Sequence, residues 1–315
     1  MKPPTTHPAP DEILDRGYER VTSSLDGLAS ARFAYAKLRK DGEYYFTKFK
    51  ISPDARAGAL LNDVSWCQAI GAIDTTRPLN FRAPRIIEND GAGEWYVAQW
   101  IDGQVRVGPD SFGSSLDRYL ETYVQALIDV DRVPAESVKA FFGGGQGSTA
   151  TPPLTHRWSE WTPKPLREGQ LQQSDVQRAA ALVDQYGRFV ESRFQHGDFV
   201  PWHFMTDTRG QLWLIDGEHA SYAKPRYYDL AYIYSRIFCR MEDPGRAMRL
   251  IKLFMEWSTR SLYDLYPALL PVMVARAIGL QFDAINDYPE IDYRHRAQDF
   301  MARCLSEDPK QLLEL

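Results

Sequence analysis

The stretch FQHGDFVPWHFMTDTRGQLWLIDGEHASYAKPRYYDL, residues 194–230, decides the fold. Three of the six histidines of the chain and several carboxylates lie in it. Two short apolar runs, residues 203–205 and 211–216, flank a DTRG turn sequence, a pattern typical of a β-hairpin. Asp198 precedes one arm of this hairpin and Asp216 ends the other, so we expect the two carboxylates to converge.

The order of polar residues along this stretch is the one that phosphoryl transfer requires. Asp198 follows His-Gly, a further ligand type, His203, comes five residues later, and an apolar strand closes on Asp216. In such a reaction one carboxylate orients and deprotonates the hydroxyl nucleophile, and a second carboxylate with a neighbouring ligand holds a metal ion on the nucleotide phosphates. A chance hairpin with surface acids is the alternative interpretation.

The same residues resemble the aminoglycoside phosphotransferase and choline kinase-like family, small-molecule kinases with the protein-kinase fold. The family pattern is HGDxxxxN, then an apolar strand that runs into an Asp often followed by a bulky residue and Glu, then an Asp-Leu that opens a helix. The matching residues are, in chain order, His196-Gly197-Asp198 of the catalytic loop, Asp216 and Glu218 of the metal-binding motif, and Asp229-Leu230-Ala231 of the structural Asp-Leu-Ala.

The resemblance implies a role for each of these side chains. Asp198 is implied as the base that activates the acceptor hydroxyl. His196 is implied as a second residue of the catalytic loop, which supports the loop more than it takes part in the chemistry, because a carboxylate is already in reach. Asp216 and His203 are implied as ligands of the metal ion, and Asp229 as the residue that holds the catalytic loop in shape.

One departure from the family pattern concerns the metal site. His203 stands where the family usually has Asn, and imidazole is a softer donor than Mg²⁺ prefers. Because macrolide phosphotransferases and some aminoglycoside kinases also have His at this position, an active enzyme is the main expectation. The first alternative is a pseudokinase that binds nucleotide without turnover. The second is a hydrolase that holds a transition metal tightly on His196, Asp198, His203, Asp216 and His219.

The first hundred residues predict a small antiparallel sheet with one helix. Residues 31–38 and 43–51 are rich in strand formers and flank a KDG turn. Residues 83–101 contain two more short strands joined by a DGAG turn. Between these pairs, residues 53–70 have apolar positions at helical spacing, with Ser52 as the N-cap.

The resemblance extends to nucleotide-binding residues of this sheet. In such kinases a strand lysine contacts the nucleotide phosphates and pairs with an acid on the next helix. Lys48 is favoured over Lys50, which points to the same face, because the family lysine tends to lie in mid-strand. Asp63 is the helix acid, one methylene shorter than the usual Glu, so its pairing could be confined to a closed state. Trp100 and Ile101, in AQWIDG, resemble the hinge whose backbone would bind adenine.

Helical patterns dominate the rest of the chain. They cover residues 116–130, 175–194, 226–238 and 244–263 and a final set that reaches the C-terminus. We therefore predict an α+β, bilobed protein-kinase-like fold. A nucleotide-binding lobe would cover residues 1–102, of which 1–10 are a flexible leader, and a larger, mostly helical lobe with the catalytic loop and the acceptor site would cover residues 103–315.

Some further segments are given no part in the chemistry. Residues 143–149, GGGQGST, are expected to form a flexible loop, since no Walker lysine follows them. Residues 11–24 show a mixed helical periodicity. Four acids near the C-terminus are attributed to a solvated helical face, with recognition of an amine-bearing acceptor as the alternative: Asp283, Asp287, Glu290 and Asp292.

Composition places the chain among ordinary globular proteins. Of its 315 residues 44% are hydrophobic, and 37 Lys and Arg against 42 Asp and Glu give a formal charge of −5, so nucleic acid is not an expected partner. Three widely spaced cysteines predict reduced thiols, and the N-terminus has no apolar signal region. The apolar residues 265–280 are interrupted by prolines and an arginine. We expect them to form a buried helix of a cytoplasmic protein that does not enter a membrane.

The reactants follow from the resemblance. It implies ATP or GTP as the phosphoryl donor, Mg²⁺ or Mn²⁺ as the metal ion, and a small hydroxylated molecule as the acceptor. The family includes kinases of aminoglycosides, macrolides, choline-like amino alcohols, amino acids and sugars. Acceptor choice depends on the shape of the variable helices, so no residue of the sequence selects one of them, and the oligomeric state is equally open.

Overall fold

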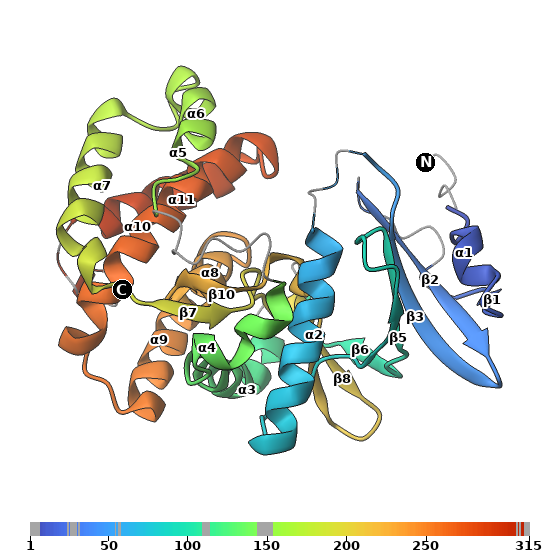
Figure 1. Ribbon diagram of the computed structural model, residues 1–315. Coiled ribbons are helices and arrows are strands. Elements are labelled where there is room, and N and C mark those ends of the chain that lie inside the picture. The colour runs from blue at the N-terminus through green and yellow to red at the C-terminus, as the bar shows by residue number, and fades with distance from the viewer. Residues whose placement is uncertain are drawn as a thin grey trace. The chain divides into compact units, whose positions relative to one another are not determined.

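The structure is a computed structural model of the chain (Figure 1). It describes residues 7–23, 25, 30, 32–53, 55, 58–108, 114–143, 154–306, 308 and 310–311. Contacts divide the chain into two compact units, Met1–Val105 with Phe204–Ala220, and Arg106–His203 with Ser221–Leu315. Residues 1–6 of the expected leader, and all of the expected loop at 143–149 except Gly143, lie outside the described residues.

The first unit contains a five-stranded antiparallel sheet in the order β1-β2-β3-β5-β4. Its strands are β1 (Glu19–Val21), β2 (Phe33–Lys40), β3 (Glu43–Lys50), β4 (Ile86–Asn89) and β5 (Trp95–Gln99). The β2–β3 hairpin turns at Asp41 and Gly42, whose φ angles are 52° and 83°, as a tight Asp-Gly hairpin turn requires. The predicted hairpin and the predicted strand pair within residues 83–101 are both confirmed.

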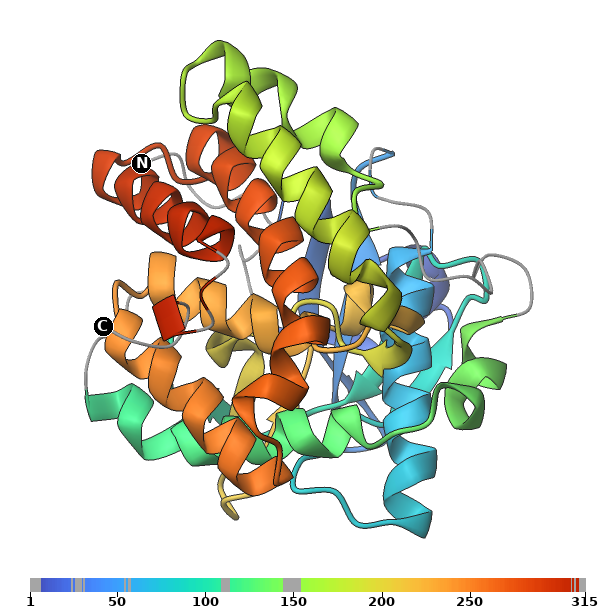
Figure 2. The same cartoon turned by 90° about the vertical axis from the view of Figure 1, so that its left-hand side faces the viewer.

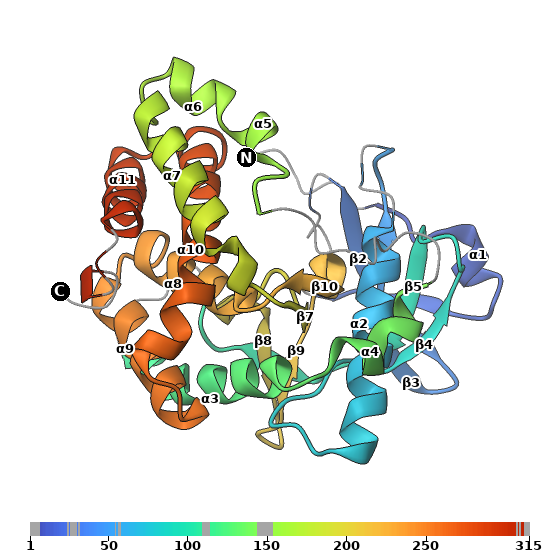
Figure 3. The same ribbon diagram turned by 60° about the vertical axis from the view of Figure 1, so that its left-hand side comes forward.

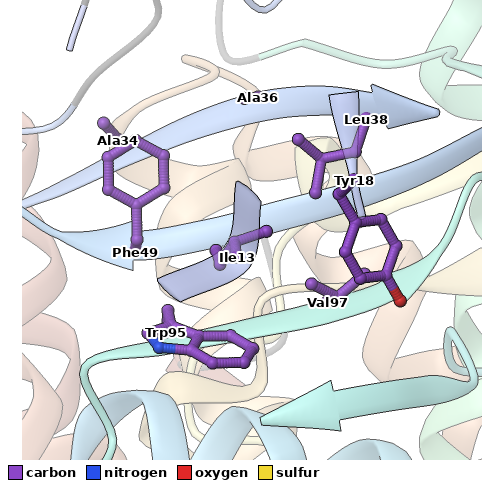
Figure 4. Packing of buried hydrophobic residues seen from close by; sticks show 8 residues of the cluster. All are labelled: Ile13, Tyr18, Ala34, Ala36, Leu38, Phe49, Trp95 and Val97. Atoms are coloured by element: carbon purple, nitrogen blue, oxygen red, sulfur yellow. The ribbon is translucent and has the colours of Figure 1, made fainter. Parts of the chain in front are cut away.

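One face of this sheet is closed by the N-terminal segment (Figure 4). The buried cluster consists of Ile13, Tyr18, Ala34, Ala36, Leu38, Phe49, Trp95 and Val97. Helix α1 (Asp11–Leu14) is attached to it because the Trp95 indole N–H donates to Glu12 (3.0 Å). Helical structure predicted over residues 11–24 is wrong beyond α1, since Gly17 turns the chain with a φ of 85° and β1 then pairs with β2.

The other face of the sheet is covered by α2 (Ala59–Thr76). A second buried cluster joins this helix to the strands and includes Ala59, Leu60, Val64, Tyr96 and Ala98. The helix predicted over residues 53–70 is therefore confirmed in place, but its start is wrong. Gly58, left-handed with a φ of 79°, is the N-cap in place of Ser52. Asp54, Arg56 and Ala57 lie outside the described residues.

The hairpin predicted from residues 203–216 forms part of a second sheet in the first unit. This sheet has the order β6-β8-β9, with β6 (Gly103–Val105), β8 (Phe204–Asp207) and β9 (Leu212–Leu214). Arg82, which follows α2, donates its backbone N–H to Leu212 (2.9 Å) and accepts that of Leu214 (2.8 Å). These two hydrogen bonds hold β9 beside the segment that follows α2, and the chain continues from β9 to Asp216.

The second unit is mainly helical (Figures 1 and 2). Its helices are α3 (Ser114–Asp131), α4 (Ala135–Val138), α5 (Trp158–Trp161), α6 (Pro163–Arg167), α7 (Gln173–Tyr186), α8 (Tyr228–Cys239), α9 (Pro244–Ser258), α10 (Leu262–Asn286) and α11 (Ile291–Leu305). Two strands, β7 (Ser192–Gln195) and β10 (Ser221–Pro225), pair antiparallel. The helices predicted over residues 116–130 and 226–238 are confirmed.

Two predicted helices of this unit are too long. The one predicted over residues 175–194 ends at Tyr186, where a short 3-10 turn follows (Gly187–Phe189), and Ser192–Gln195 then pair with β10 as strand β7. The one predicted over residues 244–263 ends at Ser258, because Thr259 takes a left-handed conformation with a φ of 56°.

Helix α10 is the central helix of the second unit. It packs against α5, α7, α8 and α11 (Figure 2), which confirms the buried helix predicted over residues 265–280. By length and hydropathy it is the one helix in the described part of the chain that could cross a membrane. However, 83% of its most apolar window is buried inside the structure, as in the core helix of a globular domain.

Candidate active site

A buried lysine of β3 is the centre of the candidate site in the first unit. Lys48 is 2% exposed, and its Nζ donates to three carboxylates: Asp63 (3.2 Å), Asp216 (2.5 Å) and Glu218 (3.2 Å). Lys50, the alternative lysine, contacts Glu94 (3.1 Å) at the end of the strand and is 22% exposed. Of the two lysines, Lys48 is therefore the one that the fold brings to the acids of the sequence motif.

Asp63 of α2 is held from three directions. Its carboxylate accepts hydrogen bonds from the Tyr96 hydroxyl (2.8 Å), from Lys48 (3.2 Å) and from the backbone N–H of Gly217 (2.9 Å). The side chain is 1% exposed. Because Asp is one methylene shorter than Glu, its pair with Lys48 could have been confined to a closed state. In this structure the pair is formed, because α2 packs directly against β5.

Lys48 is kept charged by the three carboxylates around it. Burial alone would lower the pKa of Lys48, but Asp216, Asp63 and Glu218 raise it well above its ordinary value, so the ammonium stays protonated. Arg32 is a second cation, with Nη2 2.8 Å from Glu218. Three carboxylates against these two cations leave one negative charge, which attracts a divalent metal ion.

The two acids of the predicted metal-binding motif differ in exposure. Glu218 is 6% exposed and is bound by Lys48, by Arg32 and by His219, whose Nε2 lies 3.3 Å from Glu218 Oε1. Burial alone would raise its pKa, but the hydrogen bond from His219 and the charge of Lys48 lower it to about 2. Asp216 is 29% exposed. Glu218 therefore fixes the cluster from inside, and Asp216 is the carboxylate that can reach a ligand.

The backbone around Asp216 takes a conformation that few residues adopt. Asp216 is left-handed, with φ 66° and ψ 51°, a region that Asp tolerates better than most other residues. The next residue is held against α2, since a Cβ on Gly217 would lie 2.5 Å from Trp66 Cβ. Only glycine fits there, so the path of the chain past α2 decides where the Asp216 carboxylate points.

In the second unit, buried Asp229 holds the loop that the sequence predicts to be catalytic. Its carboxylate accepts the backbone N–H groups of His196 and Gly197, both at 2.7 Å, and the residue is 1% exposed. Gln195 Oε1 in turn accepts the N–H of Asp229 (3.0 Å). Burial raises the pKa of Asp229 to about 6, although the two backbone hydrogen bonds act in the opposite direction.

The two histidines of this loop have different surroundings. His196 is fully buried, and its Nδ1 accepts the backbone N–H of Asp198 (3.3 Å), so it shapes the loop around the 24%-exposed Asp198 side chain. Nδ1 of His203 lies 2.9 Å from the Asp198 carbonyl oxygen. Because a carbonyl only accepts, this nitrogen carries the proton, and the lone pair of the neutral imidazole is on Nε2.

The donors suit a metal ion that arrives with a nucleotide. Mg²⁺ on phosphates needs only one or two protein carboxylates and completes its shell with water and phosphate oxygens. Asp216 is such a carboxylate, in a cluster with net negative charge, and in the second unit the imidazole of His203 is a nitrogen donor. Across the described ranges no three His, Cys, Asp or Glu side chains form a group that could hold a metal ion.

The expected hinge residues follow the end of β5. Pairing with β3 ends at Gln99, so the backbone of Trp100 and Ile101 leaves the sheet. Both residues line a cavity of about 750 Å³ together with Arg82 and the β8–β9 turn. Its lining includes none of the acids around Lys48, so it is distinct from the phosphate-binding cluster, and adenine binding by Trp100 and Ile101 stays a prediction.

Three contributors to these clusters were not predicted, namely Arg32, Tyr96 and Gln195. Tyr96 lies directly opposite Lys48 in the β3–β5 register, so knowledge of that register would have placed its hydroxyl near Asp63. Gln195 directly precedes the HGD motif. Arg32 lies just before β2, where no local pattern marks it.

Comparison with known proteins agrees with this geometry. The fold and the arrangement of charged groups define a protein-kinase-like phosphotransferase, and the predicted α+β fold class is confirmed. The family model described as "Phosphotransferase enzyme family" matches residues 23–264. The chain belongs to this phosphotransferase family. A search of curated proteins found no match.

Solved structures with the same fold include kinases of different acceptors. Choline kinase LicA from Streptococcus pneumoniae is 12% identical, with coverage of 94% of this chain and 98% of that chain and a TM-score of 0.54. Macrolide 2'-phosphotransferase MphH from Brachybacterium faecium is 14% identical (94% and 97% covered, TM-score 0.56). A thermostable mutant of aminoglycoside phosphotransferase APH(4)-Ia, in a ternary complex with ADP and hygromycin B, is 10% identical (92% and 97%, TM-score 0.58). At these identities the likeness concerns the fold.

Proposed function

We propose that this protein transfers the γ-phosphoryl group of ATP or GTP to a hydroxyl of a small molecule. The observation that carries the proposal is the buried Lys48, which is bound at once by Asp63 of α2 and by Asp216, which follows β9. A lysine with this pair of partners is the phosphate-binding arrangement of protein-kinase-like enzymes. Structures of similar fold contain AMP and ADP, which supports a nucleotide as donor.

The proposed reaction assigns one task to each group. Asp198 accepts the proton of the acceptor hydroxyl as its oxygen bonds to the γ-phosphorus, and the bond from that phosphorus to the bridging oxygen of the nucleoside diphosphate breaks. Lys48 neutralises charge on the phosphate oxygens. His196 and Asp229 hold the loop that carries Asp198, so they act as positioning residues.

Asp216 would hold the metal ion, with His203 as a second donor. A Mg²⁺ or Mn²⁺ ion held there would offset the negative charge of the phosphates and so reduce their repulsion towards the attacking oxygen. Because the carboxylate of Asp216 is already oriented by Lys48, it needs little rearrangement to meet the metal ion. Trp100 and Ile101 would offer backbone groups to the adenine or guanine base.

The cysteines bear on where the protein works. Cys67, Cys239 and Cys304 are buried free thiols. Buried thiols that form no disulfide are typical of a reducing compartment, which supports our proposal of a cytoplasmic enzyme.

Calorimetric titration tests the donor and metal assignments. Wild-type protein and Asp216→Ala would each be titrated with ATP and with GTP, with Mg²⁺, with Mn²⁺ and without metal. We expect metal-dependent binding of at least one nucleotide, lost in Asp216→Ala. Nucleotide binding that does not depend on the metal ion would favour the pseudokinase. The observation that supports this alternative is His203, which stands where the family usually has Asn. No binding of either nucleotide would overturn the proposal.

Turnover separates the enzyme from the pseudokinase. Release of nucleoside diphosphate would be followed with a panel of hydroxylated acceptors, and Asp198→Asn is the inactive control because it keeps the shape of the side chain and removes the base. Acceptor-dependent release that Asp198→Asn abolishes supports the enzyme. Equal release by both proteins would contradict the role of Asp198.

A further inference from the structure

Helix α8 carries a polar face that starts beside the predicted catalytic loop. Tyr228, Tyr232, Arg236 and Arg240 follow one another at intervals of four residues and so lie on one side of the helix. Other residues of α8 are fully buried in the core, among them Leu230, Ile233, Tyr234 and Ile237. Tyr228 and Tyr232 are only half-buried. Tyr228 directly precedes Asp229, whose carboxylate accepts the N–H groups of His196 and Gly197 (both 2.7 Å), so the face starts beside the loop that carries Asp198. Burial is the larger reason that the pKa values of both tyrosines are raised, and the charge of Asp198 also contributes.

Helix α10 packs against α8 (Figure 3), and its Arg276 lies against this face. The guanidinium carbon of Arg276 lies 4.6 Å from the ring centroid of Tyr232, and that of Arg236 lies 5.1 Å from it. Both arginines contact Asp283 Oδ2, Arg276 at 2.5 Å and Arg236 at 3.2 Å. Arg236 Nη2 also donates to the Tyr232 hydroxyl (3.0 Å). Two guanidinium groups therefore contact one tyrosine and share one carboxylate oxygen.

This arrangement leaves a buried positive charge without a matching acid. Arg236 is 9% exposed and Arg276 is 8% exposed, and Asp283 is the buried carboxylate that serves both. The Nε of Arg236 is buried, and the described residues provide no hydrogen-bond partner for it. Asp287, the next acid along the chain, is exposed, so water screens its charge. Since an unmatched buried charge is unfavourable, an anionic group from a ligand would stabilise the cluster.

The same contacts remove Asp283 from amine recognition. The solvated face predicted for Asp283 is wrong, because α10 turns this residue inward to the arginines. Asp287, Glu290 and Asp292 are exposed, as predicted. On this side of α8, an amine-bearing acceptor would thus contact two arginines, which repel it, and a carboxylate that already forms ion pairs with them.

We infer that the acceptor is a hydroxylated molecule with an anionic group, a carboxylate or a phosphate, and that Arg236 and Arg276 bind this group. The inference rests on the proposed function, since it takes Asp198 as the residue that receives the hydroxyl. Tyr228 and Tyr232 lie between these points and would flank the carbon skeleton. One to two turns of helix separate Arg236 from the two tyrosines, so the hydroxyl and the anion would be roughly 6–12 Å apart.

A matched panel of acceptors tests this inference. Glucose, glucosamine, glucuronate and glucose 6-phosphate share one ring and differ in charge, and each would be titrated calorimetrically into the nucleotide-loaded protein and assayed for release of nucleoside diphosphate. We expect at least tenfold tighter binding of glucuronate or glucose 6-phosphate than of glucose and glucosamine. The two anions distinguish a carboxylate from a phosphate ligand. Equal or tighter binding of glucose or glucosamine would overturn the inference, whether or not any acceptor is turned over.

Two variants separate the charge of the cluster from its packing. Arg236→Gln leaves the Arg276–Asp283 pair with no excess charge, so we expect the preference for the anion to fall by at least tenfold. The double variant Arg236→Gln with Asp283→Asn leaves Arg276 as an unmatched cation, so the preference should return to within about threefold of that of wild type. Loss of the preference in both variants, with folding confirmed by thermal unfolding, would overturn the role of the charge.

The proposed function and this inference fail in different measurements. Metal-dependent nucleotide binding, and its loss in Asp216→Ala, involve no residue of α8 or α10. If nucleotide binding behaves as proposed and the anions show no advantage, the inference alone is wrong. If nucleotide binding fails, the proposed function itself falls.

Discussion

The ammonium of Lys48 lies 2.5 Å from Asp216 Oδ1, and this contact joins the five-stranded sheet to the segment that follows β9. Lys48 is almost fully buried, whereas Asp216 is 29% exposed. Lys48 is fixed by Asp63 and Glu218, so the Asp216 carboxylate is oriented before any ligand binds. Orientation of this kind lowers the reorganisation that a nucleotide-bound metal ion would require.

Lys48→Met tests this relationship. The substitution leaves three carboxylates without their shared cation, so we expect the free energy of unfolding to fall by about 3–5 kcal/mol and metal-dependent nucleotide binding to be lost. Urea unfolding and calorimetry measure the two effects. Lys50→Met is the matched control on the same face of β3, and because Lys50 is a rim residue paired with Glu94 it should cost no more than about 1 kcal/mol. Equal costs for the two variants would contradict the central place of Lys48.

Gly217→Ala tests the packing that places Asp216. A Cβ at this position would lie 2.5 Å from Trp66, which is fully buried and cannot move aside, so we expect a loss of about 1–3 kcal/mol in unfolding free energy. The displaced chain should also weaken nucleotide binding. Gly71→Ala in the exposed part of α2 is the control, since a Cβ there meets nothing within 4 Å and should stabilise by up to about 1 kcal/mol. Unchanged stability of Gly217→Ala in urea unfolding would show that this contact does not constrain the chain.

The acids and the lysine of the site were predicted because they lie in local patterns. Asp198 and Asp216 flank one short hairpin in the sequence, and the alternation along β3 puts Lys48 on a definite face. The choice between Lys48 and Lys50 needed more than alternation, since both share that face. It depends on which residue lies opposite Tyr96 of β5, a non-local relationship that strand pairing determines.

The errors have the same origin. The helix predicted over residues 175–194 was extended too far because its last residues continue a helical spacing, but pairing with β10 makes them strand β7. Asp283 was placed on a solvated face because acids usually lie there. Its burial depends on Arg236 of α8, which is 47 residues away in the chain but only 3.2 Å away in space.

Asp229→Asn tests the hydrogen bonds that hold the predicted catalytic loop. The folded pKa of Asp229 is about 6, above its ordinary value of 3.8, so the protonated acid is favoured by the folded state. Its contribution to stability is complete below pH 4 and is lost as the pH rises through 6. We therefore expect the unfolding free energy of wild type minus that of the variant to fall by about 2 kcal/mol between pH 4 and pH 7. A difference that rises with pH in urea titrations would contradict the raised pKa.

His203→Asn tests the departure from the family pattern. An amide oxygen suits Mg²⁺ better than an imidazole nitrogen does, and Mn²⁺ accepts nitrogen more readily. If His203 binds the metal ion, the ratio of the rate with Mn²⁺ to the rate with Mg²⁺ should fall by about tenfold in the variant. Initial rates of nucleoside diphosphate release at saturating metal measure this ratio. His203→Ala is the control, because it removes the donor without supplying an oxygen and should lower both rates. A ratio that neither substitution changes would show that His203 is held by the Asp198 carbonyl alone and takes no part in metal binding.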